Sequence, residues 1–118
     1  MDYKSGKHCK YLILYHIILV CKYRRKLLVK TGEDIKSIIQ DVSLKYGFTV
    51  ETMEVDKDHL HMLISTTPEQ SPKSLVTLIK KITTYRIWRL NLETVTFLRK
   101  YIRRKHMFWS DGSFICTI

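Results

Sequence analysis

The sequence contains few residues that interrupt secondary structure or cross-link the chain. It holds two prolines, four glycines and three cysteines among 118 residues, and it shows no repeat, low-complexity tract or linker. The cysteines (Cys9, Cys21 and Cys116) are odd in number, and no two have the Cys-x-x-Cys spacing. This argues against a disulfide framework and a cysteine zinc site, and it fits a reducing cytoplasm. A chain of this length is expected to form one domain over residues 1–118.

The chain also lacks a hydrophobic run long enough to cross a membrane. Its longest nearly apolar stretch, Tyr11 to Cys21, is interrupted by His16 and is too short for a transmembrane helix. The basic run from Lys22 to Lys26 follows directly, where a signal peptide would need small residues. We therefore expect no targeting segment, no membrane partner and a cytoplasmic location.

Acidic residues are scarce. The chain has 21 Lys and Arg against 11 Asp and Glu, which gives a net charge of +10 and a pI of about 9.7. Such an excess favours a polyanionic partner, either a nucleic acid or an anionic membrane surface. The alternative is simply a basic soluble protein. The hydrophobic fraction of 45% permits a modest core and excludes a disordered chain.

The hydrophobic pattern predicts the order β-α-β-β-α-β. Strands are expected at residues 10–22, 48–55, 59–66 and 113–118, and helices at about 33–46 and 72–90. Thr31 and Gly47 are expected to cap the first helix, and Ser71 and Pro72 to begin the second. Residues 91–106 fit a short basic helix or an irregular arm, and 109–112 resembles a turn. The order is that of an α/β (α+β) ferredoxin-like fold, an antiparallel sheet with both helices on one face.

The most informative residues are His59 and His61. Because side chains alternate along a strand, both imidazoles lie on one face, while Leu60, Met62 and Ile64 face the core. Two neutral imidazoles could hold a divalent metal that polarises a phosphodiester oxygen. The alternative is a solvated strand face with two polar residues. Two-histidine phosphoesterases would need two separated His-x-Ser/Thr motifs, which the chain does not show.

Two other histidines and the densest basic run have no clear role in the sequence pattern. His16 fits either a polar group near such a metal or a satisfied core histidine, and His8 carries no further indication. A charge run is usually solvated, and the run here consists of Arg99, Arg103, Arg104, Lys105 and His106. Trp109 is expected in the core, because large aromatics supply much of a small domain's buried area.

Four segments, in order, resemble the single-tyrosine HUH transposases of small insertion sequences that move as single strands. Residues 15–26 are similar to the opening strand of that family, and 58–64 to its metal-binding strand. Residues 71–86 resemble its second helix and 109–114 its last strand, whereas 91–106 match poorly. The matches span nearly the whole chain.

The resemblance implies a chemistry. His59 and His61 would bind Mg²⁺ or Mn²⁺, and a tyrosine on a C-terminal helix would attack single-stranded DNA to form a 5′-phosphotyrosine. A glutamine one turn after that tyrosine, a homodimer and recognition of hairpin DNA are also implied. Both the tyrosine and the glutamine are expected after the last strand. Because the sequence ends at Ile118, we expect this 118-residue chain to lack the catalytic helix and not to cleave DNA.

Tyr101 is a poor substitute for the missing nucleophile. It precedes the last predicted strand, in a basic segment where an amphipathic or stacking tyrosine is expected. Covalent catalysis needs a nucleophile held in attack geometry beside the metal. No other residue matches the role.

Two groups of residues are predicted to contact DNA. The first lies where the opening strand leaves the sheet and combines phosphate-neutralising charge with a stacking ring: Lys22, Tyr23, Arg24, Arg25 and Lys26. The second is Lys73, Lys80 and Lys81, which lie off the apolar stripe of the second helix. That stripe is expected to be Leu75, Leu78, Ile79, Ile82 and Tyr85. The alternatives are a solvated turn and an ordinary wet helix face.

We therefore expect a transposase-like protein that binds single-stranded or hairpin DNA. Two further hypotheses stay open. The chain could be a catalytically silent module or regulator that binds a DNA or RNA hairpin without metal, or a non-functional product whose fold survives.

Overall fold

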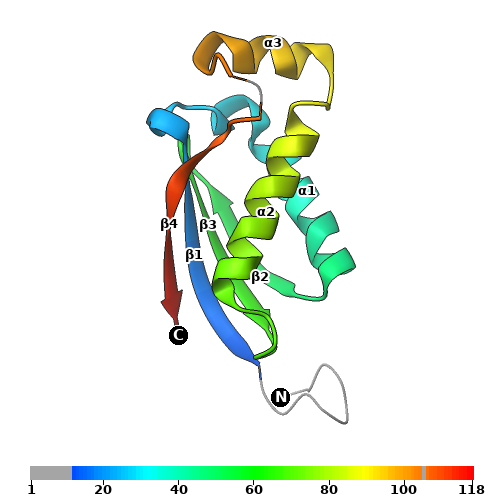
Figure 1. Cartoon of the computed structure of the whole chain (residues 1–118), viewed down its shortest axis with the longest axis vertical. Coiled ribbons are helices and arrows are strands. Elements are labelled where there is room, and N and C mark those ends of the chain that lie inside the picture. The colour runs from blue at the N-terminus through cyan, green and yellow to red at the C-terminus, as the bar shows by residue number, and fades with distance from the viewer. Residues whose placement is uncertain (1–11, 105) are drawn as a thin grey trace.

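The protein forms a four-stranded antiparallel sheet with two helices packed on one face, as Figure 1 shows for the computed structural model. The structure describes residues 12–104 and 106–118, so His8, Cys9 and Lys105 lie outside the described residues. The elements are β1 (Ile13–Cys21), η1 (Lys22–Arg24), α1 (Leu28–Tyr46), β2 (Thr49–Val55), β3 (His59–Thr66), α2 (Pro72–Ile87), α3 (Leu92–Tyr101) and β4 (Trp109–Thr117). The strand order β2-β3-β1-β4 confirms the predicted ferredoxin-like fold.

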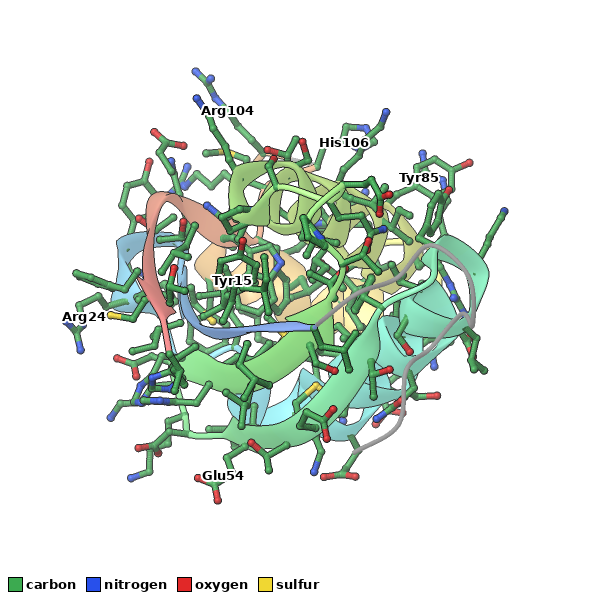
Figure 2. The ribbon with its side chains drawn as sticks, turned by 90° about the horizontal axis from the view of Figure 1, so that it is seen from below. Tyr15, Arg24, Glu54, Tyr85, Arg104 and His106 are labelled. Carbon is green, nitrogen blue, oxygen red and sulfur yellow. The ribbon has the colours of Figure 1, made fainter. Side chains whose placement is uncertain are left out.

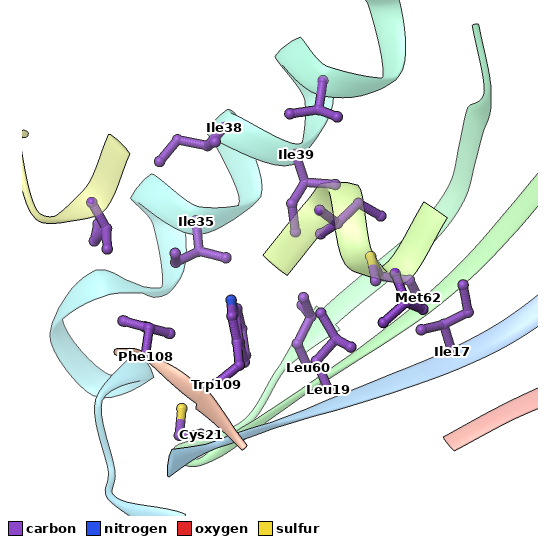
Figure 3. Close-up of a cluster of buried hydrophobic side chains, with 14 of the residues drawn as sticks. Ile17, Leu19, Cys21, Ile35, Ile38, Ile39, Leu60, Met62, Phe108 and Trp109 are labelled. Atoms are coloured by element: carbon purple, nitrogen blue, oxygen red, sulfur yellow. The ribbon is translucent and has the colours of Figure 1, made fainter. Parts of the chain in front are cut away.

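The core lies between the sheet and helices α1 and α2. Alternate residues of β1 and β3, including Leu19 and Leu60, are fully buried and form one cluster with Ile35 and Ile39 of α1 (Figure 3). Burial of each such side chain stabilises the fold by about 1.5–3 kcal/mol. Cys21 belongs to the same cluster, and its burial raises the pKa of its thiol to about 12. It is therefore an inert core residue at neutral pH.

The first helix begins earlier than the capping pattern predicted. Thr31 is fully buried inside α1, and its hydroxyl donates to the Leu27 carbonyl at 2.8 Å, one turn back. The N-cap assigned to Thr31 is therefore wrong, because the buried Leu27 and Leu28 extend the apolar stripe backward. Gly47 ends the helix as predicted, with φ of 78° and its N–H bonded to the Ser43 carbonyl.

The second helix begins as predicted, and its predicted stripe is confirmed except at Tyr85. Ser71 caps it by accepting from the Ser74 N–H at 3.1 Å. The helix ends at Ile87, and Tyr85, expected in the buried stripe, is 57% exposed. Leu75 and Ile79 of the expected stripe are buried, and Leu78 and Ile82 pack against the core while partly exposed. The helix also buries three residues outside that stripe: Val76, Thr83 and Ile87.

The position of Lys80 also differs from the prediction, which has this residue facing away from the core. The side chain is partly buried, and its ammonium donates to the carbonyls of Ser110, Asp111 and Gly112 at 2.8–3.1 Å. The expected outward orientation is wrong, because the irregular start of β4 offers three carbonyls to one cation.

A third helix, α3, occupies most of the segment for which two alternatives were open. Asn91 caps it by accepting from the Thr94 N–H at 2.8 Å, and Lys30 of α1 pairs with Glu93 at 2.9 Å. The basic-helix alternative is thus confirmed for Leu92–Tyr101, and the irregular-arm alternative is wrong there. No helix within the described ranges is long and apolar enough to cross a membrane.

The turn predicted at 109–112 is wrong, since these residues begin β4. Cys21 pairs with Trp109 and Leu19 with Ser113, so three residues of β4 oppose the single Val20. Such a bulge tolerates the polar and glycine residues that suggested a turn. Trp109 is buried as expected, and its indole N–H donates to the Thr83 hydroxyl at 2.8 Å.

Candidate metal and nucleic-acid site

Three histidines meet on the sheet face that carries no helix. His59 and His61 share this face of β3 as predicted, and their ring centroids are 4.9 Å apart. His16 reaches the same cluster from β1: its Nε2 lies 3.4 Å from His61 Nδ1. Of the two interpretations of His16, the polar neighbour of the pair agrees with this position, and a core histidine does not.

A carboxylate orients the first histidine of the pair. Asp58 Oδ1 lies 2.9 Å from His59 Nδ1, and Asp58 Oδ2 lies 3.4 Å from Nε of Arg24. The hydrogen bond from His59, and secondarily the charge of Arg24, holds the pKa of the Asp58 carboxyl below its usual value. Because an ionised carboxylate only accepts, Nδ1 of His59 is the donor in this contact, and the neutral ring then carries its lone pair on Nε2.

The second histidine has the corresponding neighbour in His16. When His61 Nδ1 donates to His16 Nε2, His61 also keeps its Nε2 lone pair free. Partners of this kind fix the tautomer of metal-binding histidines in proteins. The pair can therefore offer two nitrogen ligands from one sheet face.

The described residues provide few further ligands. No group of three or more His, Cys, Asp or Glu within them is arranged to hold a metal ion. Asp56 Oδ2 lies 3.9 Å from His59 Nε2, and Glu54, the β2 partner of His61, points away from the molecule in Figure 2. Binding of a metal by His59 and His61 thus stays a prediction, with the remaining positions open to water or phosphate oxygens.

The first group of predicted DNA contacts lies beside this cluster. Tyr23 and Arg24 of η1 adopt left-handed backbone conformations, with φ of 56° and 53°. Tyr23 is 69% exposed, and Arg24, which projects outward in Figure 2, links η1 to the Asp58–His59 pair. Arg25 and Lys26 are also exposed.

The second group lies in a groove between α2 and β4 of about 640 Å³, which Lys22 also lines. The structure thus brings Lys22, Lys73, Lys80 and Lys81 together. Their charges are not equally available, however. Lys22 pairs with Asp111 at 3.4 Å, and the ammonium of Lys80 is saturated by carbonyls, with burial lowering its pKa. Lys73 and Lys81 are exposed and form no ion pair with the described residues.

Three residues near these surfaces have surroundings that the sequence pattern did not indicate. Asp58 could have been found, because an acid directly before a metal-binding histidine is a common orienting partner. His16 could be placed near the pair only once the register of β1 against β3 was known. Tyr101 packs against Phe97, with centroids 5.2 Å apart, and lines a groove with Tyr23 rather than contacting the histidines.

Known proteins resemble the chain in sequence. ISDra2 transposase TnpA of Deinococcus radiodurans is 37% identical over 81 residues, which cover 68% of this chain and 58% of that protein. The transposase for insertion sequence element IS200 of Salmonella typhimurium is 25% identical over 118 residues, which cover 99% of this chain and 74% of that protein. The chain thus spans only part of the length of these relatives.

Solved structures share the fold. A candidate transposase from Deinococcus radiodurans superposes with a TM-score of 0.81 at 24% identity, covering all of this chain and 86% of that one. A REP-associated tyrosine transposase bound to a REP hairpin gives a TM-score of 0.64 at 15% identity, covering all of this chain and 62% of that one. At these identities the likeness establishes the fold alone.

The family model described as "Transposase IS200 like" matches residues 9–118. This match spans nearly the whole sequence and includes the histidine cluster, η1 and the α2–β4 groove. The chain therefore belongs to the IS200-like transposase family.

Proposed function

We propose that this chain binds single-stranded DNA that carries a hairpin, as found at insertion-sequence ends. The observation that carries the proposal is the pair His59 and His61, oriented on an open sheet face beside the cationic turn η1. The net charge of +10 supports a phosphate-rich partner. The solved relative bound to a REP hairpin supports a hairpin as the form of DNA.

The proposal includes a divalent metal, Mg²⁺ or Mn²⁺, held by Nε2 of His59 and of His61. When bound, the metal would supply Lewis-acid polarisation of a phosphodiester oxygen. The protein orients the two ligand rings through Asp58 and His16, and the neutral tautomers that donate from Nδ1 would leave both Nε2 atoms free for the metal. Because the described residues offer only two ligands, we expect weak binding that strengthens when DNA is present.

The family reaction would be cleavage and rejoining of single-stranded DNA through a 5′-phosphotyrosine. In the described ranges, no tyrosine hydrogen-bonds to or stacks on His59 or His61. Tyr101 packs on Phe97 instead. We propose that the 118-residue chain binds DNA without cleaving it.

A homodimer is also part of the proposal. Strands β2 and β4 form the sheet edges, and the edge strand β4 carries Phe114, a large apolar side chain that is 66% exposed. A second copy would cover such a surface. Sedimentation equilibrium at micromolar concentration, which distinguishes a monomer from a dimer, tests this part.

The first experiment mixes the chain with a labelled single-stranded hairpin and Mn²⁺. We expect a shifted complex on a native gel and no covalent adduct on a denaturing gel. An adduct would overturn the proposed lack of cleavage, and Tyr101 would be the first tyrosine to replace. No complex at moderate salt would overturn the binding proposal and support a non-functional product with a surviving fold.

The second candidate function is a silent module that binds a DNA or RNA hairpin without metal. The absence of a third ligand among the described residues favours it. The double variant His59→Ala/His61→Ala distinguishes the two, with the same titration in EDTA as the control. If the metal contributes, the variant loses the affinity gained with Mn²⁺ and matches the wild type in EDTA. Unchanged affinity in all conditions would support the module.

A further inference from the structure

We propose that a second groove, between η1 and the C-terminal end of α3, binds the unpaired DNA strand next to the hairpin. This η1–α3 groove has a volume of about 440 Å³ and is lined by Tyr23, Arg25, Tyr101, Ile102, Arg103 and Arg104, with Met107. An adjoining hollow shares Arg25, Tyr101 and Arg103 and adds Arg99 and Lys100. The inference rests on the proposed function and deepens it by naming the surface for the single strand.

The groove carries positive charge that the described residues do not neutralise. No acidic residue lines it, and neither Arg25, Arg103 nor Arg104 forms an ion pair with a described residue. Figure 2 shows Arg104 extended away from the molecule. The α2–β4 groove differs, because Lys22 there forms an ion pair with Asp111 and Lys80 donates its protons to backbone carbonyls. Free guanidinium groups are well suited to phosphate oxygens, which they bind in a bidentate manner.

Two tyrosine rings give the groove a surface for bases. Tyr23 is 69% and Tyr101 42% exposed, although both are large aromatic residues. The ring of Tyr101 is supported by Phe97, and Tyr23 lies in a left-handed turn, a costly conformation for a residue with a side chain. Aromatic rings beside a cationic groove are typical of single-strand binding, because unpaired bases can stack on them.

A chain of side-chain contacts links the turn at one wall of the groove to the histidine cluster. Arg24, between Tyr23 and Arg25, contacts Asp58, which in turn contacts His59. A strand whose phosphate lies at the histidine pair would therefore pass η1 and enter the η1–α3 groove. A duplex would not suit this path, since its bases are already paired and stacked and cannot lie on the tyrosines.

The test compares a blunt hairpin with hairpins that carry an unpaired 5′ or 3′ tail, by fluorescence anisotropy. We expect tighter binding of one tailed form. The double variant Tyr23→Ala/Tyr101→Ala should lose about tenfold or more of the affinity gained from the tail, a larger loss than it shows for the blunt hairpin. Tyr23→Phe/Tyr101→Phe should retain it, because the rings remain. Arg103→Gln/Arg104→Gln should make the slope of log K against log salt shallower by about one for each phosphate left without a guanidinium partner.

A matched control comes from the far end of α1. Tyr46→Ala/Lys45→Gln removes a half-exposed tyrosine with a cation 5.7 Å from its ring centroid, the same chemistry outside the groove. It should not alter tail binding. A 2-aminopurine in the tail reports stacking directly, and its fluorescence should be quenched by the wild type and not by the double alanine variant.

The outcomes distinguish failure of the groove proposal from failure of the proposed function. Equal affinity for tailed and blunt hairpins, without quenching, would overturn the groove and leave the proposed function intact. Failure to bind any hairpin would overturn both. Tighter binding of an RNA tail than of the same DNA tail would overturn the assignment of DNA as the partner.

Discussion

At the scale of single residues, one ammonium group holds the irregular start of β4 against α2. Lys80 donates to three successive carbonyls, so each of its protons is used. We expect Lys80→Met to lower the free energy of unfolding by about 1–2 kcal/mol, because charge-assisted hydrogen bonds are removed from a partly solvated site. Urea denaturation measures this.

The neighbouring residue supplies the control for that substitution. Lys81 is exposed and makes no ion pair with the described residues, so Lys81→Met should leave stability unchanged within about 0.5 kcal/mol. It should instead weaken hairpin binding, if the α2–β4 groove contacts phosphates. Equal stability of both variants would contradict the structural role given to Lys80.

Residues differ in how far the sequence reveals their surroundings. The shared face of His59 and His61 followed from strand alternation, which is a local property. The position of His16 depended on pairing between β1 and β3, whose residues are about 45 positions apart in the chain. The contacts of Lys80 depended on a bulge in β4 that no local pattern specified. Local rules therefore identified the metal-ligand candidates but not the residues that orient them.

At the scale of elements, α3 is the helix most dependent on its cap. It has ten residues, and within its described length only Thr94 and Leu98 are buried. Asn91→Ala removes the acceptor for the Thr94 N–H and should destabilise the protein by about 1 kcal/mol. Because α3 carries Tyr101, tail binding should weaken as well. Thermal denaturation and the tailed-hairpin titration measure the two effects.

A conservative substitution of Asn91 distinguishes loss of the N-cap hydrogen bond from other effects of replacing this side chain. Asn91→Asp keeps a side-chain oxygen at the N-cap and should retain both stability and tail affinity. If Asn91→Asp behaved like Asn91→Ala, the cap would not be the cause of the change.

Helix boundaries show why elements were easier to predict than their ends. The spacing of apolar residues predicted α1 and α2. Gly47 predicted the end of α1 and Ser71 the start of α2, because these two termini depend on local backbone conformation and hydrogen bonding. The start of α1 and the buried face of α2 were decided by packing instead. Leu27, Leu28 and Val76 are buried against distant parts of the chain, and this burial outweighs local capping preferences.

At the scale of the whole molecule, the charge excess predicts a steep dependence of DNA affinity on salt. If Arg25, Arg99, Arg103 and Arg104 together neutralise about four phosphates of a single strand, the slope of log K against log salt should be about −3. Titrations between low and moderate salt measure the slope. A flat dependence would contradict a phosphate-dominated interface and favour recognition through base contacts.

The fold as a whole was predictable because the order of elements restricts the topology strongly. A β-α-β-β-α-β order with amphipathic helices has few ways to bury its apolar faces, and the observed strand order is one of them. The η1–α3 groove was not predictable in this way. It joins a turn near residue 23 with a helix end near residue 101, and its existence depends on how α3 closes the end of the sheet.

The alternation of β3 has an evolutionary consequence. Leu60 and Met62 are buried in the core while His59 and His61 lie on the open face, so the two sets share one strand in opposite phase. Insertion or deletion of a single codon within β3 would exchange them, placing imidazoles in the apolar interior and exposing the core residues. Unless a bulge absorbed it, a single-residue length change in this strand would therefore disturb the histidine pair and the core together.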